Sequence, residues 1–256
     1  MKTSTLLSGS GMFVSVTFAM LLLLLFVKTS QAQKENAAEQ TGFAAKLTRY
    51  DVKKNYQEKF RKTLSEYVLH SLRMESNVMS EAYYEKENPN IIWLIERWKN
   101  KTELDRFNSG THFNAIEILA KEALELPVKF IFVKDLEPLS KQQWRKTAAK
   151  QDNPLTVMLF VDAKPGTQQV FEDVYHVAMP QFRGEAGVVT YQISQLEEDD
   201  TQFVTYEKFR DDEAFQYHLS FPPIQPVLDY LQTSIKKQPF QSGLHNLIEF
   251  APLKRE

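Results

Sequence analysis

A histidine and a glutamate in the last third of the chain are the side chains best suited to acid–base chemistry. His218 lies nine residues beyond the segment Tyr206-Glu207-Lys208-Phe209. A neutral imidazole with a pKa near 6.5 could accept a proton from a bound hydroxyl group, and Glu207 could orient that imidazole. Structural roles are open for both: a histidine at a helix end can cap carbonyl groups. A strand carboxylate can pair with a cation, for example Arg183.

Aromatic side chains accompany this pair and could form the walls of a flat pocket, because aromatic rings stack well on one another. The candidates for contacts with a bound ligand are Phe209, Tyr191, Tyr206 and Trp98. The alternative for all four is ordinary core packing between a sheet and its helices.

The sequence contains two copies of one pattern, about 111 positions apart. Glu96-Arg97-Trp98 in the first copy corresponds to Glu207-Lys208-Phe209 in the second, and Asp51 corresponds to Asp162. Where the second copy has His218, the first has Phe107. Two copies of a small domain are expected to form a pseudo-symmetric pair, in which the second copy carries the histidine.

Each copy is predicted to fold in the order β-α-β-β-α-β, the ferredoxin-like unit. The periodicity and the turn residues predict strands at 46–52, 77–86, 91–98 and 128–134 and helices at 55–72 and 101–125, the latter interrupted near 109–110. In the second copy they predict strands at 155–163, 187–196, 201–210 and 244–250 and helices at 167–182, 211–219 and 227–236.

Several strands carry apolar or aromatic residues on both parities, which is typical of a sheet covered on both faces. The fold class predicted is therefore α+β: two tandem ferredoxin-like domains that pair their sheets into a pseudo-dimeric α/β barrel, with helices outside. The domains expected are a divergent first copy at 46–136, a linker at 137–154 and a second copy at 155–253.

The N-terminus is predicted to direct export. Residues 11–27 form an apolar run, and Ser30-Gln31-Ala32 offers small residues at a cleavage site, so 1–32 is expected to be a signal peptide followed by a flexible leader at 33–45. An uncleaved membrane anchor is the alternative, because the run approaches the length that spans a bilayer. Both place the domains outside the cytoplasm, periplasmic or secreted in the first case and anchored in the second.

Composition excludes several classes of function. There is no cysteine, so disulfides, thiolate nucleophiles and thiolate metal sites are excluded. A formal net charge of −2 with interspersed signs argues against binding to nucleic acid. The histidines have no metal-ligand spacing, and no Gly-rich phosphate loop is present, so neither a metal nor a nucleotide cofactor is expected.

The second copy resembles the antibiotic biosynthesis monooxygenase family of the dimeric α/β-barrel superfamily, and most of all its small quinol-monooxygenase-like members. The resemblance rests on Lys164-Pro165-Gly166, Arg183-x-Glu185-x-Gly187, Tyr191, Glu207-x-Phe209 and Ala214-x-x-x-His218. The chain departs from the family in having Phe209 where a tryptophan is usual. In the first copy Asn77 replaces the glycine two residues after Glu75.

The resemblance implies a reaction in which a quinol or polyphenol is oxidised by O2 with no cofactor, neither metal nor flavin. Other members bind and degrade haem through an Asn, Trp and His constellation. At the tryptophan position of that group this chain has Phe107 and His218, and Glu117 stands at the later histidine position, so haem degradation is disfavoured.

The leading hypothesis is an exported, cofactor-independent monooxygenase whose partners are a small aromatic substrate and O2. His218 would be the base, and Glu207, Phe209 and Tyr191 would line the pocket. The first copy would be the built-in partner of an intramolecular pseudo-dimer, with a further homodimer left open. The alternatives are a non-catalytic small-molecule-binding or structural protein on the same fold, and haem capture without turnover.

Overall fold

The computed structural model describes residues 43–252. The first copy comprises β1 (Ala44–Asp51), a short 3-10 helix (Lys54–Tyr56), α2 (Gln57–Ser71), β2 (Asn77–Glu85), β3 (Ile91–Trp98), α3 (Lys101–Asn108), α4 (Thr111–Ala123) and β4 (Lys129–Leu136). The second comprises β5 (Leu155–Asp162), α6 (Gln168–Gly184), β6 (Val188–Leu196), β7 (Gln202–Phe209), α7 (Asp212–Ser220), α8 (Gln225–Thr233) and β8 (Leu244–Ala251), with 3-10 turns at Pro222–Ile224 and Phe240–Gly243. The predicted signal peptide at 1–32 and most of the predicted leader lie outside the described residues.

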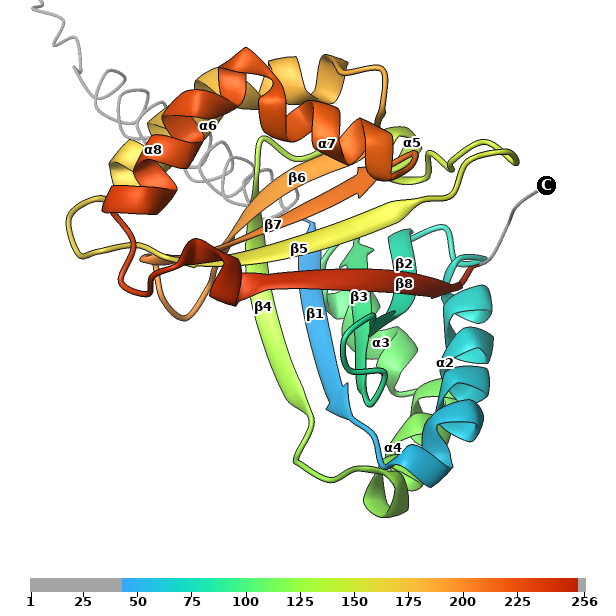
Figure 1. Ribbon diagram of the computed structural model, residues 1–256. Coiled ribbons are helices and arrows are strands. Elements are labelled where there is room, and N and C mark those ends of the chain that lie inside the picture. Colours follow the sequence, from blue (N-terminus) through green and yellow to red (C-terminus); the bar gives the residue numbers. More distant parts are fainter. Residues whose placement is uncertain (1–42, 253–256) are drawn as a thin grey trace, which may run out of the picture. The chain divides into compact units, whose positions relative to one another are not determined.

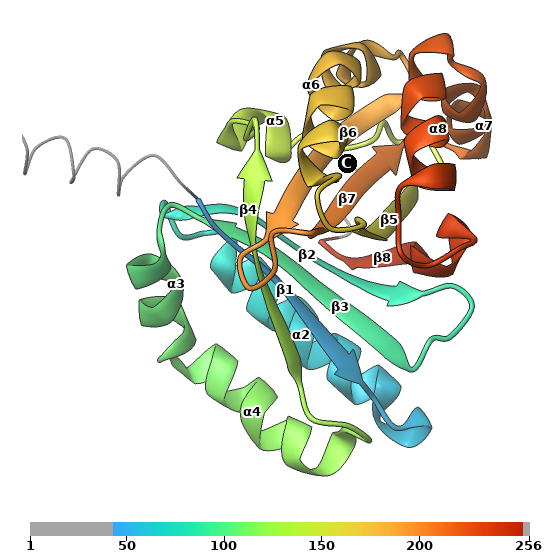
Figure 2. The same ribbon diagram turned by 90° about the vertical axis from the view of Figure 1, so that its left-hand side faces the viewer.

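The strands form one closed antiparallel barrel in the order β1-β3-β2-β8-β5-β7-β6-β4. Each copy contributes four consecutive strands, and the copies join where β2 pairs with β8 and where β4 pairs with β6. Figures 1 and 2 show the helices of each copy on the outside of its own half of the barrel. The structure confirms the predicted fold class, and it shows that the two halves pair within one chain.

A shared irregularity supports the duplication. The second strand of each copy shifts register against the third strand at its start, between Asn77 and Met79 in β2 and between Val188 and Thr190 in β6. The shifts lie opposite Trp98 and Phe209, which are corresponding residues. A β-bulge redirects the side chains around it, so both copies turn the end of this strand in the same way.

Three apolar clusters account for the stability of the molecule. One fills the barrel, and the other two lie between each half of the barrel and its helices. Side chains alternate along β7, so that Val204 and Tyr206 belong to the barrel cluster while Phe203 belongs to the helix-facing cluster. This alternation explains the apolar residues on both parities, since both faces of the sheet are covered.

The linker predicted at 137–154 does more than connect the copies. It contains the short helix α5 (Lys141–Trp144), begun by a capping box at Ser140, and Trp144 is only 2% exposed. The ring of Trp144 lies 5.6 Å from that of Tyr206, and the guanidinium of Arg97 lies 4.4 Å from its centroid. The linker therefore covers one end of the barrel, a role that an isolated tryptophan among Lys and Gln residues did not reveal.

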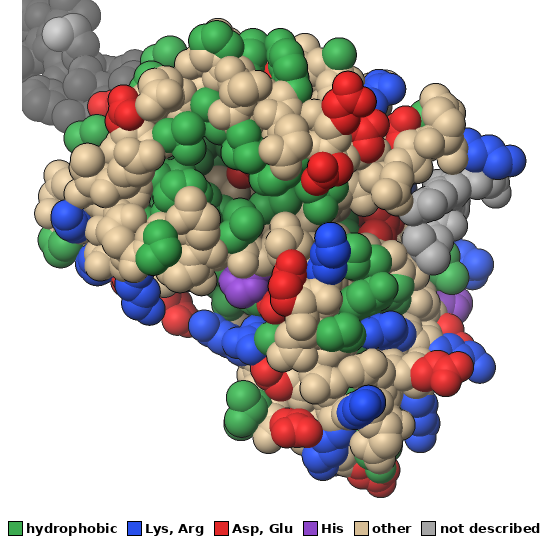
Figure 3. Space-filling view, in the orientation of Figure 1, with side chains coloured by type: hydrophobic (Ala, Val, Ile, Leu, Met, Phe, Trp, Pro, Cys, Tyr) green, Lys and Arg blue, Asp and Glu red, His purple; other side chains and the backbone are tan. Residues whose placement is uncertain are grey.

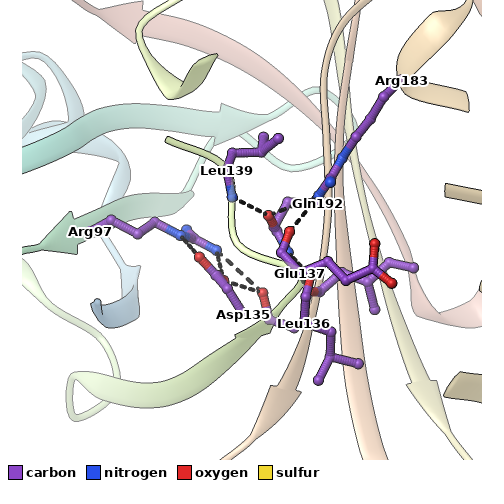
Figure 4. A network of polar contacts seen from close by, with 9 residues as sticks. Arg97, Asp135, Leu136, Glu137, Leu139, Arg183 and Gln192 are labelled. Carbon is purple, nitrogen blue, oxygen red and sulfur yellow. Dashed lines mark hydrogen bonds and ion pairs between the residues drawn. The ribbon is translucent and has the colours of Figure 1, made fainter. Parts of the chain in front are cut away.

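Buried ion pairs lie at both places where the copies join. Arg97 on β3 binds Asp135 on β4 at 2.9 Å and Ser194 on β6 at 3.3 Å (Figure 4). The corresponding Lys208 on β7 binds Glu249 on β8 at 3.2 Å and Glu81 on β2 at 2.7 Å. The hydrogen bond of Arg97 with Ser194 crosses the β4–β6 junction, and the ion pair of Lys208 with Glu81 crosses the β2–β8 junction, so both junctions contain buried polar contacts.

Arg183 does not make the ion pair with Glu207 that was considered for it. Its guanidinium donates to the carbonyl oxygens of Tyr191 and Glu137 and to the side chain of Gln192, which also ties the linker to β6 (Figure 4). Arg183 thus fixes the end of α6 and the start of the linker.

The first strand begins at Ala44, two residues before the predicted start and inside the predicted leader. Ala45 is fully buried in the barrel cluster. Two small alanines give little strand signal in a sequence, so pairing with β3 rather than intrinsic propensity decides this boundary.

Candidate active site

His218 faces Glu185, which is part of the motif Arg183-x-Glu185-x-Gly187 and was not among the predicted site residues. The Nδ1 atom of His218 lies 2.7 Å from Oε1 of Glu185, and both side chains are almost fully buried. Glu185 directly follows α6, whereas His218 lies in the last turn of α7. The second carboxylate oxygen of Glu185 has no hydrogen-bond partner among the described residues.

Local sequence explains why these two elements meet. Asp211 caps α7 by accepting from the N–H of Ala214 at 2.8 Å, and Pro222 and Pro223 follow its end. A side chain at Gly187 would place its Cβ 2.4 Å from the Cβ of Ala214. The glycine and alanine of the family-like motif are therefore in contact, and this close approach seats α7 beside the end of α6.

Aromatic rings enclose the histidine. The ring centroid of His218 lies 4.7 Å from Phe182, 5.2 Å from Phe209 and 5.6 Å from Tyr191. These rings exclude water from the imidazole on several sides, and burial disfavours a charged imidazolium. Burial lowers the pKa of His218, although the nearby charge of Glu207 acts in the opposite direction.

Glu207 lies close enough to His218 to influence it electrostatically. It accepts a hydrogen bond of 2.7 Å from Thr205, and burial raises its pKa despite the opposing effects of His218, Thr205 and Tyr191. Burial also raises the pKa of Glu185, from its ordinary value of 4.5 to about 7. The site thus holds two carboxyl groups with raised pKa values around one histidine, an arrangement suited to accepting and returning a proton near neutral pH.

An open cleft of about 740 Å³ reaches this cluster from the surface. Glu185 lines the cleft, whereas His218, Glu207, Phe209 and Tyr191 do not. The other walls come from the end of α6, the turn before β6 and the α7 region: Gln181, Gly184, Ala186, Gly187, Arg210, Asp211, Glu213, Ala214, Tyr217 and Phe221. Glu185 is therefore the member of the cluster that lines the cleft, with a side chain that is 2% exposed.

Four of the six predicted site residues meet around one point, and two do not. His218, Glu207, Phe209 and Tyr191 belong together. Tyr206 points into the barrel, where its hydroxyl contacts Tyr83 at 2.7 Å and Glu81 at 2.5 Å. Trp98 belongs to the first copy, where it donates to Glu96 at 3.1 Å. Tyr206 and Trp98 therefore lie apart from the other four. Tyr206 faces the barrel because adjacent strand residues point to opposite faces, and Trp98 lies in the other copy.

The equivalent place in the first copy is built differently. Glu96 binds the ammonium group of Lys46 at 3.1 Å and accepts from Tyr67 at 2.8 Å. Phe107 packs on Trp98, with ring centroids 4.9 Å apart. In the strand register Lys46 pairs with Glu96, and Val157 pairs with Glu207. Val157 therefore stands in the second copy where the first copy has the lysine. At this place the first copy thus holds a neutralised carboxylate, and Phe107 stands where the second copy has His218.

The family model for antibiotic biosynthesis monooxygenases matches residues 44–117 and 154–226, once in each copy and over more than half of the chain. The chain belongs to this family. It is a tandem duplication in which two family domains complete one barrel. No curated protein matches the chain.

Solved structures with the same two-copy extent are similar in fold. A monooxygenase candidate from Lactobacillus acidophilus NCFM is 16% identical with a TM-score of 0.68, over 81% of this chain and 94% of that one. A second candidate, from Fusobacterium nucleatum subsp. nucleatum, is 12% identical with a TM-score of 0.65, over 81% and 92%. An anthrone oxidase-like protein is 9% identical with a TM-score of 0.54, over 81% and 90%. At these identities the likeness concerns the fold.

Within this family member, the surface and the buried groups set the second domain apart. On the face shown in Figure 3, hydrophobic side chains gather around a hollow over the second domain, while charged side chains are frequent over the first.

Among the described residues, no group of three or more His, Asp or Glu side chains is placed to hold a metal ion.

Proposed function

We propose that this family member is a cofactor-independent monooxygenase that oxidises a quinol or polyphenol with O2 in its second domain. The observation that carries the proposal is the buried pair of Glu185 and His218, which meets an open cleft through Glu185 and has no equivalent in the first domain.

Glu185 is the group that accepts the substrate proton. A carboxyl group with a pKa of about 7 is a stronger base than an ordinary glutamate and is still largely available at neutral pH. His218 holds that carboxylate through Nδ1, 2.7 Å away, and can share the proton. This refines the sequence hypothesis: His218 stays in the proton-accepting unit, while Glu185 faces the ligand.

The substrate supplies the electrons. A quinol anion is electron-rich enough to react with O2, and the enzyme contributes deprotonation and a shielded site. In the overall reaction a quinol and one O2 give a hydroxyquinone and one water. One oxygen atom enters a ring C–H bond, the other leaves as water with two substrate hydrogens, and four electrons pass from the substrate to O2. The proton held by the pair is returned when water is formed.

The cleft suits a flat ring. Tyr217 and Phe221 provide aromatic surface on one side, and the turn at Gly184 and Gly187 provides backbone without side chains. Phe209 and Tyr191 contact the His218 ring, so their proposed role is to position the imidazole and keep it dry.

The test is oxygen uptake by the full chain in mild detergent, supplied with 1,4-naphthohydroquinone and a small panel of polyphenols in the presence of a metal chelator. We expect uptake above autoxidation, one O2 consumed per substrate, and no hydrogen peroxide. Glu185→Gln and His218→Ala should each lower the rate at least about 100-fold, the usual scale for loss of a general base.

Glu75→Gln is the matched control, because Glu75 is the exposed counterpart of Glu185 in the first copy. It should leave uptake unchanged. Full activity in Glu185→Gln, or uptake that disappears with the chelator, would contradict the proposal.

A binding protein without turnover is the second candidate, and one observation favours it: His218 is enclosed by three aromatic rings and does not reach the cleft. If the protein binds without turnover, the quinols and polyphenols of the panel should shift the midpoint of thermal unfolding and should not be oxidised faster than in buffer.

We further propose that the chain is exported and acts outside the cytoplasm, with 1–32 removed as a signal peptide or retained as an anchor. The support is the apolar run at 11–27 followed by Ser30-Gln31-Ala32. None of the described helices is long and apolar enough to cross a membrane. N-terminal sequencing of the protein from cells should begin at Gln33; an intact Met1 in the membrane fraction would show the anchor.

A further inference from the structure

The barrel has one covered end and one open end. Trp144 of the linker covers the first, as described above. At the other end, where β1 and β5 finish and β4 and β8 begin, lies a cavity of about 310 Å³. We call this cavity the barrel mouth. Both copies contribute to it, and it is separate from the cleft at Glu185.

Three aromatic rings form one part of the barrel mouth. The ring of Trp93 lies 5.9 Å from Phe160 and 5.8 Å from His245, and Phe160 lies 5.5 Å from His245. All three line the cavity; Phe160 and His245 are partly exposed and supply the aromatic surface for a planar ring, while Trp93 is 2% exposed and packs against them.

Glu85 fixes two of these rings. Its Oε1 accepts from Nε1 of Trp93 at 2.9 Å and contacts Nδ1 of His245 at 2.8 Å. Burial alone would raise the pKa of Glu85, but these two hydrogen bonds outweigh it and hold the pKa below its usual value. The carboxylate therefore stays ionised, and Nε2 of His245 is left without a partner among the described residues.

The rim of the barrel mouth is positive. Lys129 and Lys237 are exposed there, and neither has an ion-pair partner in the part of the chain that the structure describes. The one acidic residue among the lining side chains, Asp162, is paired with Lys236 at 2.8 Å. The field at this opening therefore attracts an anion.

The two copies differ at this place, as a binding site requires. In the strand register, Trp93 corresponds to Val204, and Phe160 corresponds to Arg49. His245 on β8 corresponds to Ile131 on β4. On the pseudo-symmetry axis, the aromatic rings are thus concentrated in one of the two sets of corresponding positions.

We propose that the barrel mouth is a second ligand site, which binds a small planar aromatic acid with its ring against Trp93 and Phe160 and its acidic group toward Lys129 and Lys237. The site is independent of the proposed oxidation, and its occupant does not react there. An aromatic acid fits both halves of the cavity, because the rings take the planar part and the unpaired ammonium groups take the charge.

The test is calorimetric titration of the full chain in mild detergent with 2-naphthoate, using 2-naphthylmethanol as the neutral counterpart. We expect one naphthoate per chain. The double variant Lys129→Gln/Lys237→Gln should bind naphthoate about fivefold more weakly, the scale of two exposed charge interactions, and should bind the alcohol as before. Phe160→Leu should weaken the binding of both compounds.

The matched control is Lys59→Gln/Lys62→Gln, which removes the same charge from exposed positions on α2. Naphthoate binding should be unchanged in it. The proposal is overturned if no binding is seen at millimolar naphthoate, if the control weakens binding as much as the mouth variant, or if Glu185→Gln weakens it instead, which would place the ligand in the cleft. None of these binding outcomes requires turnover, so this test is separate from the oxygen-uptake test of the proposed function.

Discussion

At the scale of single residues, the two domains differ most in what surrounds one strand glutamate. Glu96 has an ammonium group at 3.1 Å, whereas Glu207 has a valine in the corresponding position. The first domain therefore neutralises its carboxylate with a fixed charge. The second leaves its carboxylate without a cation at this position, and burial raises the pKa of Glu207 despite its hydrogen bond from Thr205 and the nearby His218. This difference favours a structural role in the first domain and a chemical one in the second.

Replacement of Lys46 should show that Glu96 is structural. Lys46→Met leaves a fully buried carboxylate without its cation, and we expect a loss of about 3–5 kcal/mol in the free energy of unfolding. The double variant Lys46→Met/Glu96→Gln should recover most of that loss, since no charge is left unpaired. Urea unfolding measures both, and equal destabilisation in the single and double variants would contradict the assignment.

Glu185→Gln should make the protein more stable at high pH and not at low pH. The pKa of this carboxyl group is about 7 in the folded protein against 4.5 ordinarily, so the folded state holds the proton more tightly. The stability contributed by the protonated group is complete below pH 4.5 and is lost as the pH rises through 7. Glutamine mimics the protonated form at every pH.

The difference between Glu185→Gln and the unchanged protein should therefore grow from near zero at pH 4.5 to about 3 kcal/mol above pH 7, given about 1.4 kcal/mol per pKa unit. Thermal or urea unfolding across that range measures it. A constant difference at all pH values would mean that Glu185 is not buried with a raised pKa.

At the scale of elements, contact between one turn and one helix positions the site. Gly187 and Ala214 approach so closely that a Cβ at Gly187 would overlap with Ala214. Gly187→Ala should therefore displace α7 and with it His218. We expect a loss of about 1–3 kcal/mol in stability, as for an overpacked site, and a larger proportional loss of oxygen uptake. Gly184→Ala is the control for stability, because nothing lies within 4 Å of its added Cβ; equal losses of stability in the two variants would contradict the role of the contact.

Most elements could be predicted from the sequence because their signals are local. Pro222 and Pro223 separate α7 from α8, and Ser109-Gly110 separates α3 from α4, at the predicted places. Glu185 was missed as a site residue because its role depends on α7 packing beside the end of α6, which no local pattern encodes. Tyr206 was misplaced because its face of the strand becomes clear only when both sheets are in place.

At the scale of the whole molecule, neither domain completes its own sheet. The barrel closes only when β2 meets β8 and β4 meets β6, and the ion pair of Lys208 with Glu81 crosses one of these junctions. The first domain, which has Phe107 in place of His218, is therefore needed to hold the second. We infer that the two domains fold as one cooperative unit.

Trp144→Ala should reveal this cooperation. The substitution empties one end of the barrel at a side chain that is 2% exposed, and we expect a loss of about 3–5 kcal/mol. Calorimetry should show a single transition, shifted as a whole to lower temperature. Two transitions, with only one of them shifted, would show that the domains unfold independently.

The measurement that tests the central claim most directly is the pH dependence of kcat/KM for oxygen uptake with the best quinol, corrected for autoxidation. Glu185 must be ionised to accept the substrate proton, and burial holds its pKa at about 7. The rate should therefore rise as the pH increases through about 7 and level off above it, and the rise should be absent in Glu185→Gln. A profile that is flat through neutrality, or a rise that survives in Glu185→Gln, would contradict the role of Glu185 as the base.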